Sequence, residues 1–361
     1  MYKPHKTIFF NFLNFVVVTS TIVSGCVKER DTGPAGEYQK GVFIINEGSF
    51  TNSNGEISHL NKDNKTITNK LFETVNKRPL GGDVVQSMSI IANTGYIVCN
   101  NSNKIEIVDA STFESKGQIE NLALPRYMVG VNNKGYVSEW VSFTSNGRIS
   151  VLDLTTNKVT KTIEVGRLPE QLAIINNKLY VANSGENFLS VINLNNETIE
   201  KNLTVSDAPT DFRIDSNVKL WVLCGGKKVY DNNPPDYIDE NASTPGSLVR
   251  VNPVSGSAEL TLPFTDVSSP EDLQINGQRN RLYYSYRGAV YTHDISAQSL
   301  STTALINRSF YGLGVDPVDD ILYAAESSFS SDGKVIRYNT SSGTPIDSVN
   351  VTIGPNGFVF R

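Results

Sequence analysis

The sequence predicts an all-β fold: a seven-bladed β-propeller with four-stranded blades, closed by the last strand of the chain. The first observation is a phrase that occurs seven times, in which two short apolar strands lead to an Asp or Asn. The second is the spacing of the copies, about 40–45 residues, which is typical of propeller blades. The third is the composition. Val, Ile, Tyr and Thr alternate with other residues in short runs between turn residues, and no long helical spacing follows residue 40.

Each copy of the phrase ends at an Asp or Asn that we expect to begin a turn. The side-chain oxygen of these residues can bind backbone N–H groups just ahead of it, which favours turns. The seven positions are Asn61, Asp109, Asp153, Asn193, Asn252, Asp294 and Asn339. Because the copies agree here, we expect function to reside where they differ.

Residues 1–25 have the layout of a secretory signal peptide. Two lysines precede an apolar run over residues 8–23, and small residues follow. The run is short for a membrane span and contains two Asn residues. An ordinary cleaved signal and a poor transmembrane anchor are alternative interpretations.

The signal ends in Val-Ser-Gly-Cys, residues 23–26, which resembles a bacterial lipobox. The resemblance implies that Cys26 carries the lipid and anchors the mature chain to a membrane through this group alone. Residues 26–40 are polar with Gly and Pro, and we expect a flexible tether. Residues 28–31, Lys-Glu-Arg-Asp, resemble the export signals of surface lipoproteins, with a plain solvated linker as the alternative.

The two other cysteines, Cys99 and Cys224, fall in equivalent strands three blades apart. A disulfide needs Cα atoms within about 7 Å. We therefore expect two buried free thiols.

The fourth copy shows the four strands of a unit most clearly. They are expected over residues 171–175, 178–183, 188–194 and 198–205. The first unit, from residue 41, begins at its second strand, whereas residues 354–360 match an inner strand with nothing after it. One missing and one surplus strand complete a seventh blade, so the propeller domain is expected over 41–361. Such closure removes open sheet edges.

The phrase LYVANSGENFLSVINLNNETI, from Leu179, resembles the repeats of the YVTN or YncE-like propellers. The resemblance covers about residues 41–361 and implies a fold far more strongly than a function. The opening GVFIINEGSFTNSNGEISHLN, from Gly41, is also similar to a family of surface propeller lipoproteins in gut-type Gram-negative bacteria. Some members of that group capture cobalamin for a TonB-dependent transporter.

Ligand-binding residues are expected at one face of the ring, where the inner strands begin and the second strands end. Polar groups among aromatic side chains suit a neutral or mixed-charge small molecule or a glycan. Candidates entering the inner strands are Gln86, Arg126, Tyr127, Glu170, Gln171, Asp211, Glu271, Asp272, Tyr311 and Asn356. Candidates leaving the second strands are Trp140, Tyr286, Arg287 and Glu326, and Glu47 occupies the same position in the first unit.

One loop, residues 225–246, is about twenty residues longer than its counterparts and is expected on the same face. It offers Asp231, Asp236, Asp239 and Glu240 as oxygen ligands for Ca²⁺, but their spacing lacks the signature of a calcium loop. The sequence indicates no other cofactor.

Charge and composition exclude some classes of function. The formal charge of −5 gives no basic face for a nucleic acid. The two mature histidines, His59 and His293, fall inside third strands, and the chain has no CxxC, HExxH or GxSxG motif.

Three hypotheses on function remain. The first is a lipid-anchored outer-membrane protein, exposed at the cell surface, which captures a small molecule and passes it to a TonB-dependent transporter. The second is a lipid-anchored propeller enzyme of the lyase or lactonase type, for which carboxylate pairs are the available groups. The third is a scaffold for protein interactions. The absence of a His outside the predicted strands and of a motif nucleophile favours binding over catalysis.

Overall fold

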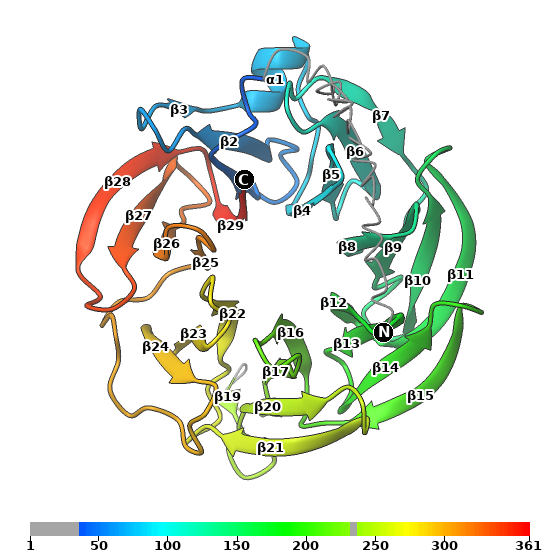
Figure 1. Cartoon of the computed structure of the whole chain (residues 1–361), viewed down its shortest axis with the longest axis vertical. Helices are drawn as coiled ribbons and strands as arrows, with labels where there is room; N and C mark the ends of the chain where they lie inside the picture. The colour runs from blue at the N-terminus through cyan, green and yellow to red at the C-terminus, as the bar shows by residue number, and fades with distance from the viewer. Residues whose placement is uncertain (1–35, 232–236) are drawn as a thin grey trace, which may run out of the picture. The chain divides into compact units, whose positions relative to one another are not determined.

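The computed structural model describes residues 36–231 and 237–361. In these residues seven antiparallel sheets form a ring around a central axis (Figure 1), so the predicted seven-bladed β-propeller is confirmed. The expected signal peptide, Cys26 and most of the tether lie outside the described residues. Among the described residues, no helix is long and apolar enough to cross a membrane.

Six of the seven blades have four strands, numbered here from the axis outward. Blade 1 consists of β29 (Pro355–Phe360), β1 (Val42–Asn46), β2 (Glu56–Leu60) and β3 (Ile67–Thr68). Blade 2 consists of β4 (Val85–Ile91), β5 (Thr94–Cys99), β6 (Lys104–Asp109) and β7 (Ser115–Ile119). Blade 3 consists of β8 (Pro125–Val131), β9 (Lys134–Glu139), β10 (Asn146–Asp153) and β11 (Lys158–Arg167).

The second half of the ring repeats this order. Blade 4 consists of β12 (Pro169–Ile175), β13 (Lys178–Asn183), β14 (Phe188–Asn193) and β15 (Thr198–Thr204). Blade 5 consists of β16 (Pro209–Ile214), β17 (Leu220–Cys224), β20 (Ser247–Asn252) and β21 (Ser257–Pro263). Blade 7 consists of β25 (Gly312–Val315), β26 (Ile321–Glu326), β27 (Gly333–Asn339) and β28 (Pro345–Val351).

Blade 6 departs from the expected four strands. It has three: β22 (Glu271–Ile275), β23 (Arg281–Tyr286) and β24 (Ala289–Asp294). At the place of the fourth strand, the chain makes only an isolated bridge between Val290 and Ile306. The stretch between β24 and that bridge is rich in Ser and Thr, which favour turns over strands.

The ring closes where the sequence predicts, because β29 pairs with β1 in blade 1. Val42 lies opposite Phe360 and Phe43 opposite Val359. One further pair of backbone hydrogen bonds joins Gly41 and Arg361, at 3.4 and 3.0 Å. The two ends of the propeller thus hold each other in a single sheet.

The aromatic residue in the second strand of the repeat explains how neighbouring blades pack. Tyr136 packs against Leu172 and Leu179 of blade 4, and Trp221 against Leu282 of blade 6. The equivalent side chains are all at most 3% exposed: Tyr96, Tyr136, Tyr180, Trp221, Tyr283 and Tyr323. The core is therefore a set of apolar interfaces between blades.

All seven predicted Asx turns form, at the opposite face of the ring from the inner-strand entrances. In each, the side-chain oxygen accepts a backbone N–H two residues further on. For example, Asp153 accepts from Thr155 at 2.7 Å and Asn339 from Ser341 at 2.9 Å. The remaining five are Asn61, Asp109, Asn193, Asn252 and Asp294.

Two local additions lie beside the first blades. The short helix α1 (Leu71–Asn76) buries Leu71 and Phe72. Residues 36–40, the last part of the expected tether, contact blades 1 and 2 through Tyr38. This side chain is buried and makes T-shaped contacts with His59 and Phe113.

The insertion of blade 5 contains a two-stranded hairpin, β18 (Tyr230–Asp231) and β19 (Tyr237–Ile238).

Candidate axial site

Backbone irregularities occur where the inner strands begin, beside the axis of the ring. In blades 1 to 6 the inner strand has a β-bulge within its first residues. In blade 2, for instance, Val85 pairs with Cys99 and Ser87 with Val98, which leaves Gln86 without a partner. A bulge frees a side chain from the alternation of the strand and can re-aim it. The bulged residues include Asn356, Gln86, Arg126, Tyr127, Glu170, Gln171, Thr210 and Asp272.

A left-handed residue precedes the inner strand in five blades. Four of the five are not glycine: Val84 (φ 57°), Leu124 (φ 52°), Leu168 (φ 50°) and Ala208 (φ 56°). The carbonyl group of each accepts a backbone N–H from the residue after the second strand, at 2.7–3.2 Å. Such conformations cost energy for residues with a Cβ, most of all for a β-branched residue such as Val84. Strain of this kind clusters at functional sites.

The best-connected group of the site is centred on Arg126 of blade 3. Its Nε donates to Glu170 Oε2 of blade 4 at 3.0 Å, and its Nη1 donates to Gln86 Oε1 of blade 2. The guanidinium also lies 4.2 Å from the ring centre of Trp140. Gln86 in turn donates to the hydroxyl of Tyr127 at 3.2 Å. Five predicted residues from three blades therefore form one cluster.

A second group joins blades 7 and 1. The Tyr311 hydroxyl donates to Glu47 Oε2 at 2.8 Å, and Asn356 Nδ2 lies 3.5 Å from the same oxygen. Asn356 also donates to the backbone oxygen of Val85 at 3.2 Å, which ties this group to blade 2. Phe329 makes a T-shaped contact with the Tyr311 ring, with centroids 5.2 Å apart.

Blades 5 and 6 contribute two carboxylates to the third group. Asp211 Oδ1 accepts from Arg213 Nη1 at 2.7 Å and from the backbone N–H of Phe212 at 2.7 Å. Asp272, with a left-handed backbone at φ 57°, has a buried Oδ2 that makes no hydrogen bond. Arg213 was not among the predicted residues, although it lies two residues after Asp211 in a strand, where every second side chain lies on the same face.

Burial dominates the electrostatics of these groups. It raises the pKa of Glu170, with Arg126 opposing, and the pKa of Asp211, with Arg213 opposing. It also raises the pKa of Glu47, against the Tyr311 hydrogen bond. The pKa of Asp272 lies well above its usual range because of burial first, then Glu271 and Asp211. Desolvated carboxylates outnumber the guanidinium groups that approach them.

Five predicted residues make no described contact with these three groups. Tyr286 is buried against Phe264, and its hydroxyl donates to Asp266 at 2.8 Å. Arg287 pairs with the same carboxylate, Nε to Oδ2, at 3.2 Å. Glu326 pairs with Arg308.

Glu271 is exposed, and Gln171 is half-buried in the bulge of blade 4. The spacing of the repeats could not separate these residues from the convergent ones. They occupy equivalent positions in the repeat, and only the contacts of each side chain distinguish them.

The face of the axial site also carries the exposed aromatic side chains of the ring. Among the described residues these are Phe50, Phe143, Tyr230, Tyr237, Tyr311 and Phe329. All lie in the segments that connect second and third strands or at an inner-strand entrance. The exposed large side chains elsewhere, such as Val254 and Val318, are aliphatic. Exposed aromatic groups on one face favour an interaction surface there.

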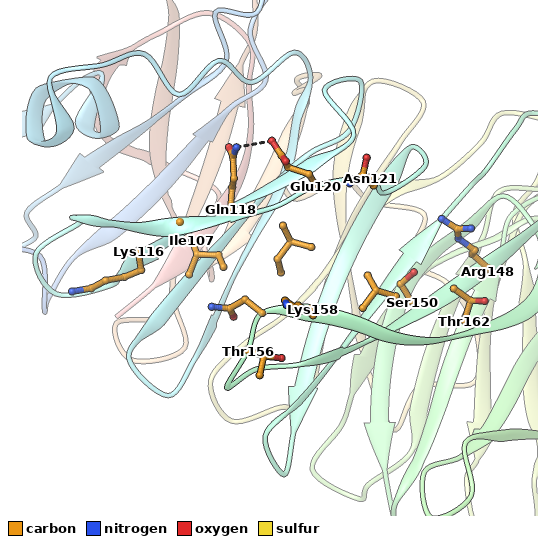
Figure 2. A pocket seen from close by; sticks show the side chains of 14 residues that line it. Ile107, Lys116, Gln118, Glu120, Asn121, Arg148, Ser150, Thr156, Lys158 and Thr162 are labelled. Carbon is orange, nitrogen blue, oxygen red and sulfur yellow. Dashed lines mark hydrogen bonds between the residues drawn. The ribbon is translucent and has the colours of Figure 1, made fainter.

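Grooves occur elsewhere on the ring as well. One of about 750 Å³ lies between the outer strands of blades 2 and 3 (Figure 2). Lys116 and Arg148 lie near its two ends, and Gln118 donates to Glu120 at 2.7 Å. None of the predicted residues lines it. A pocket of about 460 Å³ includes Glu326, at the rim of the axial face.

Metal and thiol chemistry find little support in the described residues. No group of three or more His, Cys, Asp or Glu is placed to hold a metal ion there. Cys99 and Cys224 are buried free thiols, and burial raises the pKa of each to about 12. His59 and His293 are buried, and burial lowers the pKa of His293 to about 4.

The fold and these contacts describe a β-propeller with a candidate polar site where its inner strands begin. The chain belongs to the family described as a domain of unknown function, DUF5074, whose model matches residues 40–361. No curated protein matches its sequence.

Solved structures share the fold at low sequence identity. A functionally unknown protein from Desulfotomaculum acetoxidans is 10% identical, with a TM-score of 0.65 over 89% of this chain and 98% of that one. The periplasmic gluconolactonase of Pseudomonas aeruginosa is 11% identical, with a TM-score of 0.64 over 88% and 99%. The hydrazine synthase of Kuenenia stuttgartiensis is 16% identical, with a TM-score of 0.57 over 74% and 87%. Their differing names underline that this similarity concerns the fold alone.

Proposed function

We propose that the protein is a ligand-binding propeller that captures a small polar molecule, a glycan or a cobalamin-type ligand, at the axial face. The observation that carries the proposal is the convergence of polar side chains from all seven blades at that face. Binding sites use few polar groups among aromatic surfaces, and this arrangement has both. Strained backbone at the strand entrances supports the same location.

We further propose that the protein is anchored to the outer membrane by a lipid and exposed at the cell surface. The lipobox-like residues 23–26 support a lipid anchor on Cys26, and residues 28–31 support exposure at the cell surface. The ligand would then pass to a TonB-dependent transporter in the outer membrane. The YncE-like resemblance and the aromatic side chains around the site both fit such a role.

The binding test is thermal shift with a panel of cobalamins, glycans and divalent ions. A ligand present at a hundred times its Kd stabilises the folded state by about 2.7 kcal/mol. We expect stabilisation by a polar organic ligand, and its loss in Arg126→Gln. Tyr311→Phe, which removes only one exposed hydroxyl, is the milder variant if Arg126→Gln folds poorly. Binding that neither variant weakens would move the site away from the axis.

The second candidate is an enzyme of the lactonase type, supported by the raised pKa values of the axial carboxylates. The same panel, extended by sugar lactones, decides between the two. Hydrolysis of a lactone that Asp211→Asn abolishes would replace the binding proposal with catalysis. A ligand recovered unchanged from the complex would support binding.

Anchoring has a separate test. Metabolic labelling with a fatty acid should mark the wild-type protein and leave Cys26→Ser unlabelled. Protease added to intact cells should then digest the protein if it faces outward. A lipidated protein that resists the protease until the cells are broken would contradict surface exposure.

A further inference from the structure

The two halves of the axial site differ in charge balance. In the half formed by blades 3, 4 and 5, each carboxylate has a guanidinium partner: Glu170 pairs with Arg126 at 3.0 Å and Asp211 with Arg213 at 2.7 Å. In the half formed by blades 6, 7 and 1, Glu47 and Asp272 form no ion pair with any described residue. Tyr311, at the start of the inner strand of blade 7, comes between them in the order of the ring, since that strand contacts β22 of blade 6 and β29 of blade 1. Its hydroxyl donates to Glu47 at 2.8 Å.

The unpaired half also has hydrogen-bond acceptors without donors. Asp272 Oδ2 and Asn356 Oδ1 are buried atoms that make no hydrogen bond. Buried polar atoms in native proteins are nearly always paired, so unpaired ones call for a partner. Asn356 Oδ1 is an acceptor, and Asp272 Oδ2 is one when the carboxyl group is ionised, the form that a neighbouring cation favours. The missing partner is therefore a group that carries N–H or O–H donors.

Tyr311 adds an aromatic surface to this half. Its side chain is 44% exposed, and Phe329, 47% exposed, stands edge-on to it. A cation beside an aromatic ring and a carboxylate gains from both. Two unpaired carboxylates are too few for a metal ion, in keeping with the absence of a metal-binding group in residues 36–231 and 237–361.

We propose that blades 6, 7 and 1 form a subsite for an organic cation, an ammonium group of the ligand, held by Asp272, Glu47 and Tyr311. This inference rests on the proposed axial binding function and specifies the chemistry of its ligand. A ligand with an ammonium group at one end and a body rich in hydroxyl or amide groups fits the two halves of the site. Amino sugars are one class of such ligands.

The test uses pairs of molecules that differ in charge. Triglucosamine and its N-acetylated counterpart, spermidine and triacetylspermidine, and choline and 3,3-dimethylbutanol are titrated by calorimetry at constant salt. We expect at least one cation to bind roughly tenfold or more tightly than its neutral partner, as one charge-assisted contact allows.

Asp272→Asn should remove that difference. Asn tolerates the left-handed backbone of position 272, so the variant should fold. Asp63→Asn, an exposed residue in a turn of the opposite face, makes the same charge change and should leave binding unaltered.

Each other result has its own meaning. Neutral members that bind as tightly as their cations, with loss in Arg126→Gln, would overturn the charge inference and leave the axial site standing. A cation whose affinity neither Asp272→Asn nor Arg126→Gln changes would place binding elsewhere and contradict both proposals. Absence of binding by all three cations would overturn the inference.

Discussion

At the scale of single residues, buried carboxyl groups tie the stability of the protein to pH. Glu56 in β2 accepts three backbone N–H groups, from Ile57 at 2.7 Å, Phe72 at 3.2 Å and Glu73 at 3.0 Å. Two of these donors belong to the first turn of α1, which has no side-chain cap of its own. Burial nevertheless outweighs these bonds and raises the pKa of Glu56 from 4.5 to about 7.

We predict that stability falls as pH rises from about 5 to 7.5. In this window folded Glu56 retains a proton that the unfolded chain releases, so the folded state loses its advantage as pH increases. The difference in pKa corresponds to roughly 3 kcal/mol. Urea denaturation of the wild type and Glu56→Gln, compared at both pH values, measures it.

The contribution of Glu56 is the difference between wild type and Glu56→Gln in how the free energy of unfolding changes with pH. The axial carboxyl groups contribute equally to both proteins and cancel in this difference. Glu120→Gln, a change of an exposed carboxyl, should follow the wild type. If Glu56→Gln lost stability with pH as steeply as the wild type, Glu56 would not titrate in this range.

At the scale of elements, each inner strand has a regular part that is repeated around the ring. In six of the seven blades, a β-bulge interrupts the hydrogen-bond ladder at the start of this strand. Beyond the bulge every inner strand pairs regularly with its neighbour. At the bulge, the ladder is interrupted and the preceding residue is left-handed in five blades. The scaffold and the candidate site therefore occupy different segments of the same strand.

Relief of the left-handed strain should stabilise the protein. We predict that Ala208→Gly increases the free energy of unfolding by about 1 kcal/mol, since glycine adopts φ 56° without steric cost. Chemical denaturation gives the value. Ala182→Gly, in the regular and fully buried part of β13, should instead lose about 1 kcal/mol. Destabilisation by both changes would show that the methyl group of Ala208 matters more than its backbone.

The strands could be predicted from sequence because the repeat imposes one alternation of apolar residues seven times. For Arg126, Glu170 and Gln86, the sequence predicted only the face of the ring on which they lie. It did not predict that they contact one another. The β-bulge decides which of two adjacent side chains faces the axis. The residue types around it do not reveal where a bulge will form. Tyr286 illustrates the limit: it occupies an expected position, but its ring packs on Phe264, which follows the last strand of blade 5.

At the scale of the whole molecule, the ring depends on a contact between its two ends. β29 supplies the inner strand of blade 1, and Phe358 and Phe360 pack beside Tyr323 of blade 7. Without β29, the edge of β1 would be open to other chains. Stability should therefore respond to the last residues of the chain far more than to an ordinary terminus.

We predict that deletion of residues 354–361 lowers the melting temperature and causes self-association. Scanning calorimetry and size-exclusion chromatography measure the two effects. A synthetic peptide of residues 352–361, added in excess, should restore part of the melting temperature by filling the vacant position. A truncated protein that melts and elutes like the full chain would contradict the closure of blade 1.

The bulges have a consequence for how this protein can change. A bulged residue sits outside the hydrogen-bond ladder, so its replacement leaves the neighbouring strand pairing intact. Gln86, Arg126, Glu170 and Asn356 are therefore four positions at which side chains can vary while the strand pairing of the propeller is kept. A combinatorial library at these positions would sample new ligand preferences without redesign of the propeller, and divergence among relatives could proceed by the same route.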